Sequence, residues 1–149
     1  MVATDTERFR LRRFIERLVQ RADRTRRDPE SLLAELRREL TQSDLRVVDD
    51  AAMRRLITDT YAEAVRFGAD GWIDDALAFR RDWGFRLEDI TVPVQVWQGD
   101  TDRNVPVAHA ERQAAAIPRA VLHLVPGEGH VMFVDHFEEI LGGLLNSRT

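Results

Sequence analysis

A carboxylate and an imidazole follow two short β-rich segments of the sequence at corresponding places. Asp102 lies in the loop after residues 92–98, and His130 lies in the loop after residues 120–125. Residues 107–117 between them show a helical pattern, and the alternation of strand, helix and strand is typical of parallel strands. Because ligands bind at the carboxyl ends of parallel strands, both loops belong to one functional edge of a sheet. We therefore expect Asp102 and His130 to lie close together.

Such a pair has the composition needed for proton transfer. A carboxylate that accepts a hydrogen bond from an imidazole fixes its tautomer and stabilises the imidazolium that forms when the ring takes a proton. We predict that His130 is the catalytic base and that Asp102 orients it, while Asp100 shapes the turn. Taken singly, Asp102 is better explained as a turn residue, and His130 is explained equally well as a loop histidine. The two matched loops together favour the catalytic reading.

The sequence around these two residues resembles the C-terminal part of the α/β-hydrolases. The family's motif for the catalytic acid is matched by Val94-Gln95-Val96-Trp97-Gln98-Gly99-Asp100-Thr101-Asp102 with Val105-Pro106, and its loop for the catalytic base by Gly127-Glu128-Gly129-His130. The helical region resembles the family's cap at Gly68-Ala69-Asp70-Gly71 and at Trp83-Gly84-Phe85. The resemblance implies an α/β fold with a helical cap or lid over residues 1–88. Residues 89–149 would form the core segment, with the last two parallel strands and helices of the sheet.

The nucleophile that this family uses has no counterpart in the sequence. The family presents it on a Gly-x-Ser-x-Gly elbow that precedes the acid and the base, whereas the serines here, Ser31, Ser43 and Ser147, lie in no such context. The resemblance thus implies a partial fold that is inactive alone. Asp102 and His130 would hydrolyse small ester- or amide-like substrates once a nucleophile-bearing half completes the triad. The alternative is an inactive, truncated remnant that acts as an oligomeric or interaction module.

Periodic apolar residues predict the elements that must position this chemistry. Before residue 90 we expect helices over about 6–26, from the Asp28-Pro29-Glu30 start signal through Leu40, from Asp49 or Asp50 to Val65, and over 72–81. We expect strands over 92–98 and 120–125 and a last helix over about 133–145. The aromatic residues before the first strand are expected to form the core of the cap: Trp72, Phe79, Trp83 and Phe85.

The composition excludes several kinds of chemistry. The 149 residues include no cysteine, and all 22 basic residues are arginine. Disulfides, thiolate catalysis, Schiff bases and P-loop phosphate sites are therefore excluded. Asp100, Asp102 and His130 are accompanied by no further metal ligand at a useful spacing, so we expect neither a metal nor a cofactor.

Charge and hydropathy guide the expectations about partners. The first helix is rich in arginine, which would suit nucleic acid or an anionic membrane, but Glu7, Glu16 and Asp23 interrupt it and the net charge is −4. We expect a solvated face, and hence binding of neither. With no signal segment and no apolar run of about 20 residues, we expect a cytoplasmic protein. A sheet of two strands leaves open edges, which predicts a homo-oligomer. The resemblance implies the other possible partner, a complementing N-terminal hydrolase half.

Overall fold

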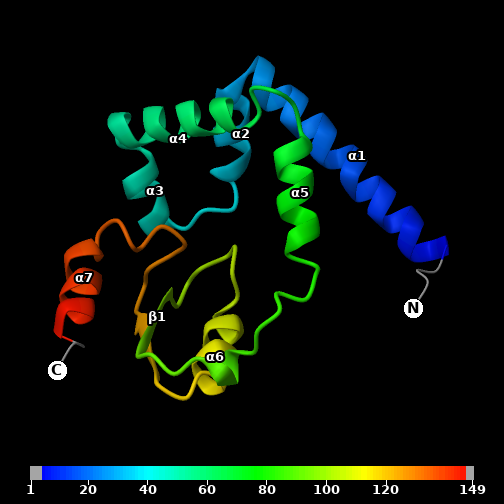
Figure 1. The fold of residues 1–149 in the computed structure, drawn as a ribbon. Helices are drawn as coiled ribbons and strands as arrows, with labels where there is room; N and C mark the ends of the chain where they lie inside the picture. The colour runs from blue at the N-terminus through cyan, green and yellow to red at the C-terminus, as the bar shows by residue number, and fades with distance from the viewer. Residues whose placement is uncertain (1–4, 147–149) are drawn as a thin grey trace. The chain divides into compact units, whose positions relative to one another are not determined.

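The computed structural model describes residues 5–146 and shows a mixed α/β chain, mostly helical, with a small parallel sheet of two strands (Figure 1). The elements follow in the order α1 (Asp5–Arg27), α2 (Pro29–Leu36), α3 (Gln42–Val48), α4 (Ala51–Ala64), α5 (Asp70–Ala78), the 3₁₀ turn η1 (Leu87–Asp89), β1 (Val94–Gly99), α6 (Val107–Ala116), β2 (Ala120–Val125) and α7 (Phe137–Asn146).

The chain divides into two compact units. The helical unit comprises the chain up to Leu36 together with Arg54–Asp82, and the sheet unit comprises Arg37–Met53 together with the chain from Trp83 onward. In this division residues 37–53 and 83–88 group with the sheet, and the boundary at residue 88 stays a prediction. One contact inside the sheet unit is a hydrogen bond from the backbone N–H of Val131 to the Asp44 carboxylate, 2.8 Å long.

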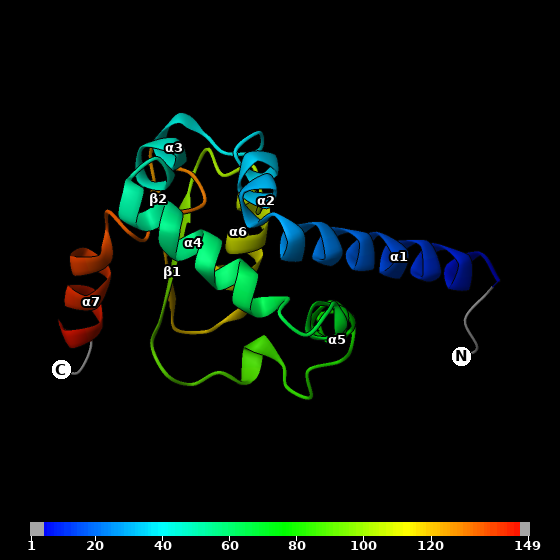
Figure 2. The same cartoon turned by 90° about the horizontal axis from the view of Figure 1, so that it is seen from above.

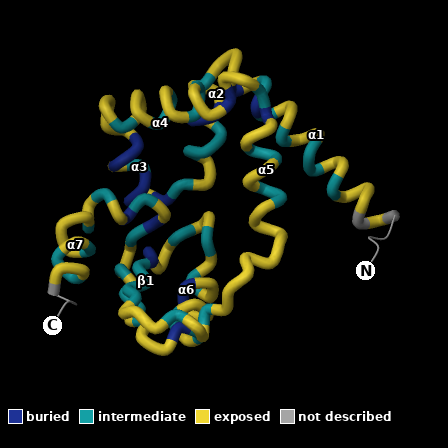
Figure 3. Tube along the Cα trace, in the orientation of Figure 1, coloured by how far each residue is buried: buried dark blue, intermediate teal, exposed yellow. Residues whose placement is uncertain are grey.

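The helical unit is built on the amphipathic α1. Its inward positions Ala22 and Thr25 are almost fully buried, and Ala22 packs with Val65 and Ala69 in a small core. The chain restarts as α2 at the predicted place, where the Asp28 carboxylate accepts a hydrogen bond from the Ser31 N–H. The first turns of α1 extend beyond α2 and α5 (Figure 2) and are largely exposed (Figure 3).

The sheet unit contains a strand–helix–strand motif formed by β1, α6 and β2. β1 and β2 pair in parallel, with Val94 opposite Ala120 and Gly99 opposite Val125, and α6 packs against both strands. The helix buries Ala110 and is followed by the buried Ile117. The predicted parallel strands and the helix between them are therefore confirmed, and both strands end at the edge where the two candidate residues follow.

Four helices differ from the prediction, among them α5, which runs from Asp70 to Ala78 and not over 72–81. α2 ends at Leu36, so that Leu40 lies outside it, and α7 begins at Phe137 and not near residue 133. Turns occupy residues 131–136, where Val131 gives its N–H to Asp44. The prediction also missed α3, whose seven residues begin with a capping box in which the Thr41 and Asp44 side chains bind each other's backbone N–H groups.

Candidate active site

Asp102 and His130 meet at the carboxyl edge of the sheet, as the sequence predicts. Asp102 lies in the loop that follows β1, and His130 lies in the loop that follows β2. The His130 Nδ1 atom is 3.0 Å from Asp102 Oδ2. The expected juxtaposition is confirmed, and the catalytic roles of the two residues stay predictions.

The Asp102 carboxylate lies among hydrogen-bond donors. Oδ1 accepts the N–H groups of Asn104 and Val105 at 2.7 and 3.0 Å, and Oδ2 accepts Gln98 Nε2 at 2.9 Å as well as His130. The side chain is only 4% exposed. Burial works to raise the pKa of Asp102, but the bonds from His130, from the two backbone N–H groups and from Gln98 together hold this pKa below its usual value. The carboxylate is thus ionised at neutral pH.

The ionised partner assigns the tautomer of His130. Since a carboxylate only accepts hydrogen bonds, Nδ1 must carry the proton, which leaves Nε2 unprotonated in the neutral ring. The His130 side chain is 44% exposed. Within the described residues, Asp102 is the only hydrogen-bond partner of the ring. Nε2 is therefore chemically suited to take a proton from a group that approaches the open side of the ring.

A small hollow lies beside the pair. Its volume is about 190 Å³, and it is lined by Trp97, Gln98, Gly99, Asp102, Val105, Gly129, His130, Met132 and Phe133. Met132 is buried, whereas Phe133 is half exposed. The hollow thus places apolar side chains next to the His130 ring.

Direct bonds fasten the two loops to each other. The Asp100 carboxylate accepts the Gly127 N–H at 2.7 Å and so joins its own loop to the turn that follows β2. The N–H and the hydroxyl of Thr101 both donate to the Glu128 carbonyl, at 3.0 and 2.7 Å. A Cβ atom on Gly99 would overlap the backbone of Glu128 and Gly129. The two loops form one tightly joined platform that carries both candidate residues.

Sequence reasoning missed residues that support this platform. Gln98 is buried, and its Nε2 donates to Asp102 and to the carbonyl groups of Gly99 and Val105. Asp44 is 1% exposed and binds the loop of His130 through Val131. The signal available for Asp44 was the Thr-x-x-Asp spacing of a capping box. No sequence pattern marks Gln98, because its role depends on the loop that folds back over it.

No serine of the described part of the chain reaches His130. The Ser31 hydroxyl donates to the Asp28 carbonyl, and the buried Ser43 hydroxyl lies 2.8 Å from that of Thr41. Ser147 lies outside the described residues. Among the described residues, Asp102 and His130 therefore lie together without a serine hydroxyl bonded to His130.

The other histidines lie away from this pair. His123 stacks on Trp97 with ring centroids 4.1 Å apart, and His136 Nδ1 lies 3.1 Å from a Glu139 carboxylate oxygen. His109 is exposed on α6. The described residues contain no group of three or more His, Cys, Asp or Glu side chains arranged to hold a metal ion.

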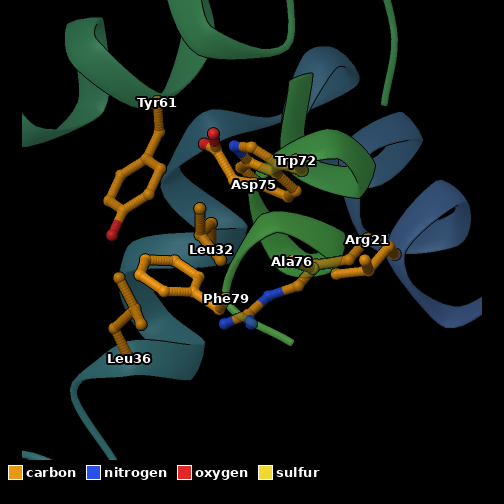
Figure 4. Close-up of a pocket in the computed structure, with 9 residues that line it drawn as sticks. Arg21, Leu32, Leu36, Tyr61, Trp72, Asp75, Ala76 and Phe79 are labelled. Carbon is orange, nitrogen blue, oxygen red and sulfur yellow. The ribbon is translucent and has the colours of Figure 1, made fainter. Parts of the chain in front are cut away.

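The helical unit contains a separate apolar pocket of about 270 Å³ (Figure 4). It is lined by Leu18, Arg21, Leu32, Leu36, Tyr61, Trp72, Asp75, Ala76 and Phe79. The expected aromatic core is wrong for three of its four members, since Phe79, Trp83 and Phe85 are 73%, 60% and 54% exposed. Only Trp72 is partly buried, packed against the core and edge-on to Tyr61. The buried apolar residues of the helical unit are therefore aliphatic: Ala22, Leu32, Leu33, Val65 and Ala69.

Several arginines of α1 make ion pairs within the helical unit. Arg12 pairs with Glu16 along α1, and Arg21 and Arg24 lie 3.4 and 3.9 Å from the Glu35 carboxylate of α2. These pairs are exposed or half-exposed, so each contributes little to stability.

Across the described residues, no helix combines the length and the hydropathy needed to cross a bilayer. Compared with models of known protein families and with curated protein sequences, the chain matches none.

Proposed function

We propose that the chain supplies the acid and the base of a Ser-His-Asp type triad in an α/β-hydrolase, and that a nucleophile-bearing half completes it. The observation that carries this proposal is the 3.0 Å hydrogen bond between His130 Nδ1 and a buried, ionised Asp102. The order of the two residues after consecutive parallel strands supports the same fold family. The proposed substrates are small esters, amides or related carbonyl compounds.

In the completed enzyme each residue has a defined step. The partner's hydroxyl attacks the carbonyl carbon while Nε2 of His130 takes the hydroxyl proton. His130 then gives this proton to the leaving group, and Asp102 stabilises the imidazolium without itself becoming protonated. Water repeats the sequence in the second half of the reaction and releases the acyl group as a carboxylic acid. The described residues supply the base and its orienting carboxylate, and the partner supplies the nucleophile and the oxyanion donors.

Complementation tests this proposal. We expect the purified chain to hydrolyse p-nitrophenyl acetate no faster than free imidazole does. Co-expression with an upstream-encoded polypeptide that carries Gly-x-Ser-x-Gly should give ester hydrolysis and a serine that reacts with a fluorophosphonate probe. His130→Ala should lower that rate by roughly 10²–10⁴-fold, the usual share of general base catalysis.

A matched control uses a histidine outside the pair. His109→Ala, an exposed substitution on α6, should leave the rate unchanged. Rapid turnover by the chain alone that His130→Ala abolishes would show that the chain has its own nucleophile. Turnover of the complex that is indifferent to His130→Ala would refute the proposed role of the base.

The second candidate function is an inactive module that binds other chains. A stripe of exposed apolar side chains on α7 favours it, here called the α7 stripe and composed of Phe137, Leu141, Leu144 and Leu145. Within the described residues β1 pairs only with β2, so no strand lies along its other edge. Both features suit the proposed partners, a second copy of this chain or the complementing half. We propose no nucleic acid or membrane partner, and we propose the cytoplasm as its location.

A further inference from the structure

The loop that carries His130 is held by a helix that lies far from it in the sequence. Asp44 of α3 accepts the Val131 N–H at 2.8 Å, directly after His130 in the chain. We propose that Asp44 is a positioning residue, which fixes this loop so that Nδ1 of His130 meets the Asp102 carboxylate. The geometric claim concerns the chain alone, and only its catalytic meaning rests on the proposed function.

In the hydrogen-bond network of Asp44, the donor and the acceptor of every bond can be assigned. Its second oxygen accepts the Thr41 N–H at 2.9 Å and the Thr41 hydroxyl at 2.8 Å. Because the Thr41 hydroxyl has given away its only proton, the Ser43 hydroxyl must be the donor in the 2.8 Å contact between these two side chains. Each polar group of this buried set thus has a partner, and the Asp44 carboxylate has a fixed orientation.

The burial of Asp44 makes its contact with the loop specific. The residue is 1% exposed, and within the described residues its carboxylate forms no ion pair with an arginine or histidine. A buried carboxylate without a cation is costly unless hydrogen bonds replace its water. One of the three bonds that do so comes from Val131, so loss of the loop would leave the carboxylate poorly satisfied. The loop and α3 therefore stabilise each other's position.

Two further contacts keep the same loop on α3. Arg46 Nη2 lies 3.2 Å from the Glu128 carboxylate, whose side chain is 18% exposed. A Cβ atom on Gly129 would overlap the side chains of Asp44 and Thr41. The backbone of the residue before His130 thus lies directly against the Asp44–Thr41 pair. His130 is held from the α3 side through its neighbours Gly129 and Val131, and from the β1 side through Asp102.

Nitrogen NMR of His130 tests the proposal with the full chain and without any activity. At a pH where the imidazole is neutral, the wild type should show one tautomer, protonated at Nδ1. Asp44→Asn retains the shape of the side chain but loses acceptor atoms, so it should give averaged tautomer signals. It should also speed amide exchange of Val131 by roughly tenfold or more, the loss of about one hydrogen bond.

The control makes the same chemical change on the same helix. Asp49→Asn alters the C-cap of α3, whose carboxylate pairs with Arg37, and it should leave the His130 signals unchanged. A folded Asp44→Asn variant that keeps the pure Nδ1–H tautomer and a protected Val131 amide overturns the proposal.

A second pair of variants decides the matter if Asp44→Asn fails to fold. Thr41→Val keeps the branched shape but removes the hydroxyl that orients Asp44, so His130 should again show averaged tautomers. Thr41→Ser keeps the hydroxyl and should restore the wild-type signals. Identical His130 signals in the two Thr41 variants would overturn the proposal. Failure of the complementation assay bears only on the proposed hydrolase function, since these signals are read in the chain alone.

Discussion

The two oxygens of Asp102 have different tasks. Oδ1 accepts only backbone N–H groups, those of Asn104 and Val105, and so shapes its own loop. Oδ2 accepts the Gln98 and His130 side chains. The backbone and Gln98 hold the carboxylate in place whether or not His130 is present. The orientation of the carboxylate is therefore preorganised, which is what an orienting group for a base requires.

The lowered pKa of Asp102 predicts a pH-dependent contribution to stability. A carboxyl group whose pKa is lower in the folded state stabilises that state above its unfolded pKa of about 3.9, and loses this effect as the pH falls through the folded value. Asp102→Asn should lower the free energy of unfolding by about 1–3 kcal/mol at neutral pH, because its amide group faces the Gln98 and His130 donors.

Urea unfolding at a series of pH values measures this contribution. The difference between wild type and Asp102→Asn should be constant above about pH 5 and shrink below about pH 4. Asp135→Asn, an exposed change in the turns before α7, should show no such difference. A difference for Asp102→Asn that is independent of pH would contradict the assignment of an ionised carboxylate.

At the scale of elements, close backbone approach requires Gly129. Gly129→Ala should destabilise the fold by about 1–3 kcal/mol, because the new methyl group meets the Asp44 carboxylate and the Thr41 hydroxyl. Gly142→Ala is the matched control, since the new methyl group meets nothing within 4 Å. Because Gly142 lies inside α7, its replacement by alanine should stabilise the fold by about 0.5–1 kcal/mol. Thermal unfolding compares both with wild type, and equal effects would contradict the close contact at Gly129.

The sequence predicts elements well where one face of the element is continuously apolar. The predicted α1 is confirmed because its periodic pattern extends over 23 residues, and the two short parallel strands are confirmed because valine recurs in both. α3 has only seven residues, and two of its four buried positions are the polar Ser43 and Asp44. Its packing depends on a backbone N–H that lies far away in the sequence. Hydropathy contains no information about such a contact.

The candidate site follows the same rule. Asp102 and His130 could be predicted because the ends of parallel strands share one edge of the sheet, and the order of strand, helix and strand can be read from the sequence. Gln98 and Asp44 could not, because their roles arise only when a loop or a helix folds back onto the pair. The aromatic core of the cap was predicted wrongly for the reverse reason. Phe79, Trp83 and Phe85 are apolar in type, yet no neighbour within the structure covers them fully.

At the scale of the whole molecule, the exposed apolar surface predicts self-association. The members of the α7 stripe are between 42% and 70% exposed, and a monomer gains nothing from leaving four such side chains in water. We expect the chain to form dimers or larger assemblies. Leu141→Glu combined with Leu145→Glu should weaken association by at least about a hundredfold, given the usual gain from burying each leucine.

Light scattering coupled to size-exclusion chromatography measures this association. Leu56→Glu serves as the control, because Leu56 is a 60% exposed leucine on α4 and lies outside the α7 stripe. The control should assemble as the wild type does. A monomeric wild type at all concentrations, or equal dissociation by both sets of variants, would contradict the role of the stripe.

The bond between Asp44 and Val131 spans 87 positions of the chain. A ribosome that adds about 5–20 residues per second makes Asp44 on the order of ten seconds before it makes Val131. During that interval the carboxylate has no amide to bind, and water must solvate it. The geometry of His130 is thus among the last features to be completed during synthesis. Nascent chains stalled before residue 131 would contain the Asp44 carboxylate but not the Val131 N–H that it binds.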